Sequence, residues 1–468
     1  MGALGDGGGG EADDLAVLDN LGTGRDVGER QLVTVGDGLQ GADGDDAASG
    51  RSGLDGRVHR EVGDGGGNVV VGMNDEGLDH ALSRCGEPFH RPAPMTAPLR
   101  RLQAFYLEAP IDEPVVNAFG AITARPALLV RLEDADGGFG WGEVWCNFPP
   151  GGGRHRLNLL ERLLGRWYLG RDPSEPGALW GEARAAFRRV AIQCAEPGPI
   201  AQVLAGIDQA VWDLGARRRG LPLARYLGAD RLRPLAAYAS GINPTAPERV
   251  VRRMRDAGYR AFKLKLGFAE DRRNLDLLDA EVASSETLLV DLNQAWDVER
   301  ARHLLPALGR RRLGWIEEPI PADEPAAAFR ELQDLSPVPL AGGENLMGEA
   351  AFAAAIEMRA LGVVQPDLAK WGGHSGAGPV ARSALQAGLR YCPHYLGGGV
   401  GLLHSAHLLC AVGGDGLLEV DANPNPLRDE LVELGPLDGD GCLCLADRPG
   451  IGAEPSLGPW RQAEVDLH

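Results

Sequence analysis

The chain has 468 residues, enough for two or three domains, and 44% of them are hydrophobic, as in proteins with a large core. Its net charge of −19 argues against nucleic acid and anionic membranes as partners. No apolar run approaches the roughly 18–20 residues of a membrane span, and we find no secretory signal. The seven cysteines include no CxxC pair. We therefore expect a cytoplasmic protein with free thiols.

Residues 1–94 differ in composition from the rest of the chain. They carry 18 Asp and Glu against 7 Arg, a net charge of −11, and contain no Lys, Trp or Tyr. Gly- and Asp-rich sequence of this kind cannot bury enough apolar surface to offset the loss of chain entropy on folding. We expect no fold here. The segment is either a disordered acidic tail or, the interpretation we favour, the product of a start assigned upstream of Met95.

From Lys265 onward, short apolar runs end in a polar residue at regular intervals. Helix-like stretches, with apolar residues three and four positions apart, lie between these runs. A strand, a loop and a helix in about 25 residues form the repeating unit of a parallel βα barrel. Residues 234–241 supply one further strand, which makes eight. The sequence therefore predicts an α/β fold with a TIM-type barrel. The polar residues stand 26, 26, 27, 23, 27 and 25 positions apart: Lys265, Asp291, Glu317, Glu344, Asp367, His394 and Glu419.

Three of these residues are candidate metal ligands. The carboxyl ends of barrel strands form one mouth, so Asp291, Glu317 and Glu344 should converge there. Three carboxylates so placed repel one another unless a cation neutralises them. Oxygen ligands alone favour Mg²⁺, with Mn²⁺ as an alternative, whereas zinc prefers His and Cys. The competing interpretation is three solvated loop carboxylates.

Two lysines and a histidine are candidate acid–base groups. Lys263 and Lys265 share one face of the predicted second strand, because side chains alternate along a strand. Beside a metal, Lys265 would have a lowered pKa and act as a general base, while Lys263 would stay charged and hold an anionic substrate. His394 lies across the mouth, where Asp367 can fix its tautomer. Such a pair suits removal of a proton next to a carboxylate; the alternative is a surface strand with solvated lysines.

These motifs resemble those of the enolase superfamily and, within it, the mandelate racemase subgroup. Glu344 and Asp367 stand where the muconate-lactonizing subgroup has Asp and Lys, which favours the racemase subgroup. The resemblance implies that Glu419 hydrogen-bonds the developing oxyanion and that Lys370 is not the base. It is carried by the KxK pair at Lys263 and Lys265, DLNQ at Asp291, WIEEP at Glu317, GEN at Glu344, PDLAKWGG at Asp367 and CPHY at His394.

The resemblance also implies how the rest of the chain is organised. After the extension at 1–94, it gives an α+β capping domain at 95–233, the barrel at 234–425 and a closing segment at 426–468 that packs back on the cap. Two cap loops, about residues 110–121 and 143–156, would close over the mouth. The residues then available to contact the substrate are Lys263, Asn293, Asn117, Trp145 and Arg154, together with Asn147 and His155.

The superfamily shares removal of an α-proton to a metal-stabilised enediolate and differs in the next step. With Lys265 and a His394–Asp367 pair, reprotonation on the opposite face would give a racemase or epimerase of a 2-hydroxy acid. We favour the other outcome, in which His394 expels a β-hydroxyl and a sugar acid is dehydrated to a 2-keto-3-deoxy acid. The alternative from another class is a barrel that binds a metal or an anion without catalysis. The expected partner is a small carboxylate, and the resemblance implies a homo-oligomer.

The composition of residues 1–94 generates a first prediction. A chain that begins at Met95 should fold and bind metal as the full chain does, because the deleted segment holds too little apolar surface to form part of a core. Circular dichroism, the thermal midpoint and the metal affinity of the two chains would be compared. Loss of the fold or of metal affinity on deletion would contradict the prediction.

Overall fold

The structure is a computed structural model that describes residues 97–117 and 120–468, so the extension at 1–94 lies outside the described part. An antiparallel sheet comes first, in the strand order β13-β1-β2-β3. Its last member in sequence forms one edge of the sheet and pairs with the first, Val465 opposite Ala104. The strands are β1 (Leu99–Asn117), β2 (Gly120–Asp134), β3 (Phe139–Val144) and β13 (Arg461–Leu467).

Both faces of this sheet are buried around residues 127–130 of β2, where four apolar residues (ALLV) follow one another. Leu128 and Val130 pack on one side with the helices that follow the sheet. Ala127 and Leu129 point to the other side and share a core with residues of the barrel, such as Leu402. Alternation along the strand thus places cap and barrel against opposite faces of one sheet. The cap helices are α3 (Gly152–Leu159), η1 (Leu160–Leu164), α4 (Gly165–Tyr168), α5 (Pro176–Gln193), α6 (Pro197–Arg218) and α7 (Leu223–Tyr226).

Glycines let α6 lie directly on β3. A Cβ at Gly142 would come within 2.0 Å of the carbonyl oxygen of Gly206, and one at Gly140 within 2.2 Å of that of Ala210. Both approaches are shorter than any side chain tolerates, so the backbones pack at a distance that only glycine permits. The GWGE sequence of β3 therefore fixes the position of the central cap helix.

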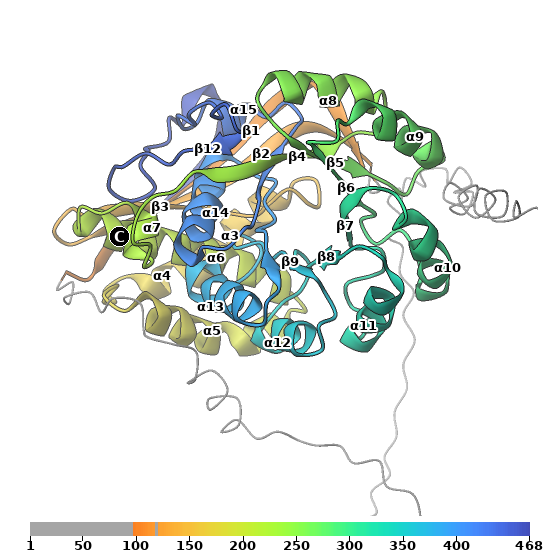
Figure 1. Ribbon diagram of the computed structural model, residues 1–468. Coiled ribbons are helices and arrows are strands. Elements are labelled where there is room, and N and C mark those ends of the chain that lie inside the picture. The colour runs from red at the N-terminus through yellow and green to blue at the C-terminus, as the bar shows by residue number, and fades with distance from the viewer. Residues whose placement is uncertain (1–96, 118–119) are drawn as a thin grey trace, which may run out of the picture. The chain divides into compact units, whose positions relative to one another are not determined.

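The second sheet consists of eight parallel strands in the order β11-β4-β5-β6-β7-β8-β9-β10, which confirms the barrel fold predicted from the sequence. Each predicted strand is present, although β9 and β10 are only two residues long. Figure 1 shows the barrel helices around the outside of the strands. The strands are β4 (Leu235–Ile242), β5 (Ala261–Lys265), β6 (Thr287–Asp291), β7 (Leu313–Glu317), β8 (Leu340–Gly342), β9 (Val363–Val364), β10 (Arg390–Tyr391) and β11 (Leu418–Asp421).

Helices alternate with the barrel strands and bury their apolar faces on the sheet. Leu304 and Leu305 of one helix, for example, pack in the same core as Val290 of the strand before it. In the described part of the chain no helix is both long and apolar enough to cross a membrane. The barrel helices are α8 (Pro247–Asp256), α9 (Asp271–Glu281), α10 (Val298–Leu308), α11 (Ala326–Leu335), α12 (Glu349–Glu357), α13 (Gly373–Gln386) and α14 (Gly399–Val412).

β10 and β11 stand at the two ends of the strand order, and the described residues show no strand ladder between them. Hydrogen bonds to side chains join them instead. The amide of Leu417 donates to Cys392 Sγ over 3.3 Å, and the amide of Tyr395 donates to Glu419 Oε2 over 2.8 Å. The chain then continues through α15 (Pro426–Asp429), β12 (Cys442–Leu443) and η2 (Gly458–Trp460) to β13. β12 pairs antiparallel with β4 on the way, so the closing segment contacts the barrel before it reaches the cap.

A carboxylate of the cap holds the loop that follows β10. Glu143, at 2% exposure, accepts hydrogen bonds from the amides of Gly398 (2.6 Å) and Gly401 (2.9 Å) at the start of α14. The first amides of a helix have no partner within the helix and carry a partial positive charge, so a carboxylate there is favourable. A cap strand is thereby fastened to the loop that begins at His394.

Three histidines are buried where the cap meets the barrel. His374 Nε2 lies 2.8 Å from His404 Nδ1, and His404 Nε2 donates to the carbonyl of Trp141 over 2.8 Å. His407 Nδ1 accepts from the amide of Ala224 over 3.0 Å. Burial lowers the pKa of His404 to about 3 and that of His407 to about 4. These imidazoles are therefore neutral in the folded protein.

The depressed histidine pKa values generate a second prediction. Below pH 6.5 the unfolded chain binds protons at these imidazoles that the folded chain does not bind, so stability is lost as the pH falls from about 6.5 towards 4. His407→Gln keeps an acceptor for Ala224 and removes one titrating group. Its urea midpoint should fall less between pH 7 and pH 5 than that of the unsubstituted chain, by the equivalent of about 2 kcal/mol. An unchanged pH slope would contradict the assignment, whatever the absolute midpoint.

Candidate active site

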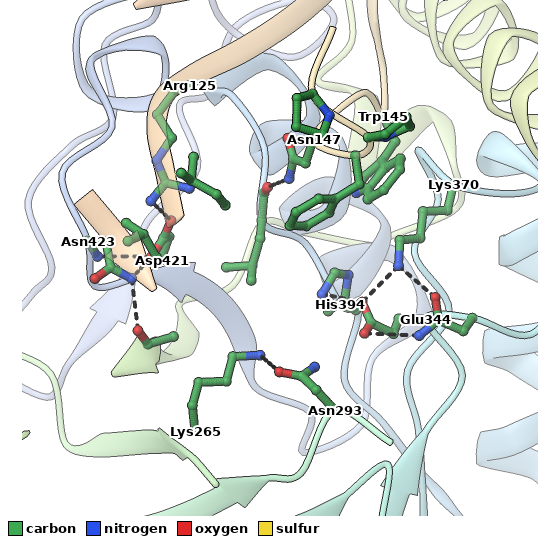
Figure 2. A pocket seen from close by; sticks show the side chains of 18 of the residues that line it. Arg125, Trp145, Asn147, Lys265, Asn293, Glu344, Lys370, His394, Asp421 and Asn423 are labelled. Carbon is green, nitrogen blue, oxygen red and sulfur yellow. Dashed lines mark hydrogen bonds and ion pairs between the residues drawn. The ribbon is translucent and has the colours of Figure 1, made fainter. Parts of the chain in front are cut away.

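A cavity of about 500 Å³ opens at the carboxyl ends of the barrel strands, and the cap contributes Val115 of β1, Ile122 of β2 and the loop after β3 to its lining. Its volume is in the range of small-molecule sites. The cavity wall combines apolar side chains of the cap with charged and amide side chains of the barrel (Figure 2). The charged and amide residues that line it are Arg125, Asn147, Lys265, Asn293, Gln294, Glu344, Asn345, Lys370, His394, Asp421 and Asn423.

Register places the predicted residues of β5, β6 and β7 at one level. Lys265 is paired with Asp291, and Asp291 with Glu317. Lys265 Nζ donates to Asp291 Oδ2 over 2.6 Å and to Asn293 Oδ1 over 2.7 Å. Lys265 and Asn293 line the cavity, whereas Asp291 lies below them at 1% exposure.

Lys263 lies beneath the cavity and does not line it. Its side chain is fully buried, with Nζ 2.5 Å from Glu317 Oε1, 2.8 Å from Glu419 Oε1 and 3.6 Å from Asp291 Oδ2. It also lies 5.5 Å from the centre of the Tyr238 ring. Burial disfavours the charge, but Glu317 and Glu419 hold the pKa of Lys263 well above its usual value. We call these four groups, Lys263, Asp291, Glu317 and Glu419, the buried charge cluster.

The remaining contacts of Glu317 and Glu419 hold both carboxylates in place. Glu317 Oε2 accepts from Gln365 Nε2 (2.9 Å) and from Trp315 Nε1 (3.1 Å). Glu419 Oε1 accepts from Ser240 Oγ over 2.5 Å. Every carboxylate oxygen in these two groups thus has a donor, as buried charges require.

His394 and Glu344 occupy another wall of the cavity. His394 Nδ1 donates to Asp367 Oδ2 over 2.8 Å, which leaves Nε2 facing Glu344 Oε2 at 2.6 Å. Lys370 Nζ lies 3.0 Å from the same oxygen of Glu344 and 4.9 Å from the Trp145 ring centre. Burial would lower the pKa of His394, but Glu344 and Glu419 raise it well above its usual value.

Backbone strain is concentrated next to the predicted metal ligands. Asn293, Gln294 and Glu318 have φ values of 43°, 66° and 38°, in the left-handed region that non-glycine residues rarely adopt. The amide of Gln294 donates to the carbonyl of Glu318 over 2.7 Å and holds the two loops together. Non-glycine residues in this region cost about 1–3 kcal/mol each, and such strain clusters at functional sites.

The three predicted metal ligands are ion-paired within the protein. Among the described residues no three Asp, Glu, His or Cys side chains are arranged to hold one metal ion in common. Asp291, Glu317 and Glu344 instead contact lysine ammonium groups and the His394 imidazole. As a donor set they fit a hard divalent cation, because all are carboxylates and all already have cationic partners. Binding an ion would require their side chains to exchange those partners for it.

The pKa of Lys265 differs in direction from the sequence-based expectation. Burial, the largest single effect, and Lys263 lower it, but the carboxylates of Asp291, Glu344 and Glu317 together raise it above the usual value. The pKa of Lys265 can fall below its usual value only if another cation pairs with the carboxylate of Asp291. The expected behaviour of Lys265 as a base therefore depends on the occupancy of the carboxylates next to it.

The predicted substrate-contacting residues are placed differently from one another. Trp145, Asn147 and Asn293 line the cavity. Arg154 is exposed, and its guanidinium lies over the Tyr106 ring, 5.5 Å from its centre, so it is not part of the cavity wall. His155 Nε2 lies 3.0 Å from Glu196 Oε1. The side chain of Asn117 lies outside the described part.

Five charged or amide lining residues were not singled out as site residues from the sequence: Arg125, Gln294, Asn345, Asp421 and Asn423. Asp421 could have been found, because it is two positions beyond Glu419 and shares its face of β11, as Lys265 shares a face with Lys263. Arg125 comes from the middle of cap strand β2, where the sequence carries no comparable signal. Lys370 was noted but given no role.

Comparison with known proteins identifies the family. Residues 101–228 match the N-terminal domain of mandelate racemase/muconate lactonizing enzymes, and residues 246–458 match the enolase C-terminal domain-like family. A crystal structure of a mandelate racemase/muconate lactonizing enzyme from Bordetella bronchiseptica RB50 is 47% identical, covers 78% of this chain and 99% of its own, and has a TM-score of 0.73. The chain therefore belongs to this family, within the enolase superfamily, as predicted from its motifs.

Two further relatives have named activities. The D-galactarolactone cycloisomerase of Agrobacterium fabrum is 29% identical over 368 residues, which cover 74% of this chain and 94% of the relative. An L-talarate dehydratase from Polaromonas sp. JS666, crystallised with Mg and L-glucarate, is 25% identical and covers 80% of this chain and 99% of its own, with a TM-score of 0.69. Enzymes of this family thus include ones that act on sugar acids or their lactones.

The unequal burial of the two lysines generates a third prediction. Lys263→Met would leave Glu317 and Glu419 charged and without their ammonium partner, and breaking a buried ion pair costs about 3–5 kcal/mol. Lys265→Met should cost clearly less, because the Lys265 side chain is 12% exposed. The urea midpoints of both variants would be measured in EDTA by circular dichroism. Equal losses would show that burial does not distinguish the two lysines.

Proposed function

We propose that this member of the mandelate racemase/muconate lactonizing enzyme family dehydrates a sugar acid to a 2-keto-3-deoxy acid, with Mg²⁺ as cofactor. The observation that carries the proposal is that Lys265 and His394 line different walls of one cavity. Lys265 ends the second barrel strand, and His394 lies in the loop after the seventh, where Asp367 holds its imidazole. Dehydration needs two such groups, a base for the α-proton and an acid for the β-hydroxyl.

The proposed reaction begins when Lys265 Nζ takes the proton from the α-carbon of the substrate. His394 Nε2 then gives a proton to the β-hydroxyl as the bond between the β-carbon and that oxygen breaks, so that water leaves. The resulting enol becomes the 2-keto-3-deoxy acid. Asp367 positions His394 throughout, because its hydrogen bond to Nδ1 (2.8 Å) directs Nε2 into the cavity.

Asp291, Glu317 and Glu344 are the residues that would hold Mg²⁺. When bound, the ion would offset the negative charge that develops on the substrate carboxylate as the α-proton leaves. The named relative crystallised with Mg and L-glucarate supports this assignment. We assign Lys263 and Glu419 to the support of these ligands. Neither Lys263 nor Glu419 lines the cavity, and neither do Asp291 and Glu317. The oxyanion role expected for Glu419 and the substrate contact expected for Lys263 stay predictions.

Racemisation or epimerisation of a 2-hydroxy acid is the second candidate, since Lys265 and His394 could exchange protons on opposite faces of one carbon.

The six cysteines of the described part are free thiols, which suits a reducing cytoplasm, and we propose that the enzyme works there as a homo-oligomer. We expect a small carboxylate substrate and neither nucleic acid nor a membrane as partner, in keeping with the net charge of −19.

A library of sugar acids incubated with the protein and Mg²⁺ tests the proposal. Formation of a 2-keto acid, abolished by EDTA and restored by Mg²⁺, is expected for at least one member. Inversion at the α-carbon without loss of water would instead identify the racemase. If no member loses or exchanges its α-proton, the protein is not an enzyme of this reaction class.

The division of labour between the two bases generates a fourth prediction. Lys265→Ala should lower the rate of deuterium exchange at α-carbons whose proton faces Lys265 by about 10²–10⁴-fold. His394→Asn should lower the rate of exchange from the other face by a similar factor. Asp367→Asn should weaken the His394 face more mildly, because the imidazole remains but loses its orientation. The measurement is NMR in D₂O with both stereoisomers of one substrate. Asp334→Asn, on the exposed face of α11, is the control. Identical patterns for Lys265→Ala and His394→Asn would contradict the assignment.

A further inference from the structure

We infer that the cavity takes a sugar mono-acid, whose distal end is neutral, in preference to the corresponding diacid. The inference rests on the proposed function and concerns one side of the cavity. We call that side the distal wall and define it by Arg125 of the cap with Asp421 and Asn423 of the barrel. Figure 2 shows these three side chains gathered opposite Lys370, His394 and Glu344.

The distal wall is a preformed and neutral unit. Arg125 Nη2 donates to Asp421 Oδ2 over 2.6 Å, and Arg125 Nε donates to the carbonyl of Pro424 over 3.2 Å. The other carboxylate oxygen of Asp421 accepts from the backbone amide (2.9 Å) and the side-chain amide (2.8 Å) of Asn423. Arg125 is 7% exposed and Asp421 6% exposed, so this pair is screened little by water. The single positive charge here is already neutralised.

A second substrate carboxylate would find no cation to pair with at the distal wall. It would leave water and approach Arg125 only together with the like charge of Asp421, which is unfavourable in a buried site. The other cationic groups that line the cavity, Lys265, Lys370 and His394, belong to the walls where the reaction is proposed. Each of them is paired there with a carboxylate.

A hydroxyl-bearing chain, in contrast, suits the same wall. One hydroxyl can accept from the guanidinium of Arg125 and donate to the carboxylate of Asp421 at the same time. The side-chain amide of Asn147 contributes a further polar group to the cavity wall. Among the residues that the structure describes, the rest of the cap's lining is apolar or aromatic and carries no charged group: Val115, Ile122, Trp145, Phe148, Pro149 and Pro150. The wall thus fits the polyol end of a mono-acid.

Asp421 is the residue that sets this preference. Removing its charge while keeping its shape would leave Arg125 positive and turn the distal wall into a carboxylate site. The pair also ties cap strand β2 to barrel strand β11, so a substitution could act through stability alone. A change in the ratio between two substrates separates these effects, because a loss of stability reduces turnover of both.

The experiment compares matched pairs of six-carbon acids that share the configuration at C2 to C5, one with a terminal hydroxymethyl group and one with a terminal carboxylate. The readout is kcat/KM for 2-keto acid formation in Mg²⁺. The unsubstituted enzyme should prefer the mono-acid of its best pair by at least about tenfold. Asp421→Asn should shift that ratio towards the diacid by about tenfold or more, with a gain on the diacid. Asp334→Asn should leave the ratio unchanged.

A preference of the unsubstituted enzyme for the diacid would overturn the inference and leave the proposed dehydration intact. If Asp421→Asn has the same mono-acid to diacid ratio as the unsubstituted enzyme, Asp421 does not set the preference, and the proposed dehydration is again unaffected. If no acid is turned over, the proposed function fails, and calorimetry with the same matched pairs decides the inference separately. Tighter binding of the mono-acid then supports it, whereas tighter binding of the diacid, or no binding of either, overturns it.

Discussion

A single buried ammonium group is the constraint on which the barrel's catalytic end depends. Lys263 has no contact with water, so its charge is tolerable only because Glu317, Glu419 and Asp291 surround it. These carboxylates come from strands β7, β11 and β6, and each in turn depends on the lysine. The buried charge cluster thus ties four of the eight strands together from within. The cluster lies beneath the cavity, which Lys265 and Asp421 line.

The same inward-facing alternation accounts for both the cluster and the cavity lining. On β5, Lys263 belongs to the buried charge cluster and Lys265 to the cavity; on β11, Glu419 and Asp421 divide in the same way. A strand has a period of two, so adjacent inward positions lie one above the other. On these two strands the barrel therefore separates a residue that supports the site from one that lines the cavity by two positions along the chain.

This separation explains what the sequence could and could not reveal. The eight strands were predictable, even β9 and β10 with two residues each, because polar residues mark the end of every run at one spacing. The burial of individual side chains could not be predicted. Nothing in the sequence AFKLKLGF indicates that Lys263 is buried and that Lys265 reaches the cavity. Contacts between distant segments were also beyond reach, as with Arg125 and Asp421, 296 positions apart, or Glu143 and Gly398. Such pairs depend on how cap and barrel meet, which no local pattern records.

The position of β13 has a consequence for how the protein is made. Among the described elements the strand is synthesised last, yet it forms an edge of the sheet whose other strands, β1 to β3, precede all the other described elements in the chain. Until residues 461–467 leave the ribosome, β1 presents an edge of unpaired backbone groups, the feature that most readily joins one chain to another. The barrel can form during that interval, but the cap sheet cannot be completed. A chain that lacks residues 461–467 should therefore associate with other chains through that edge more readily than the full chain does.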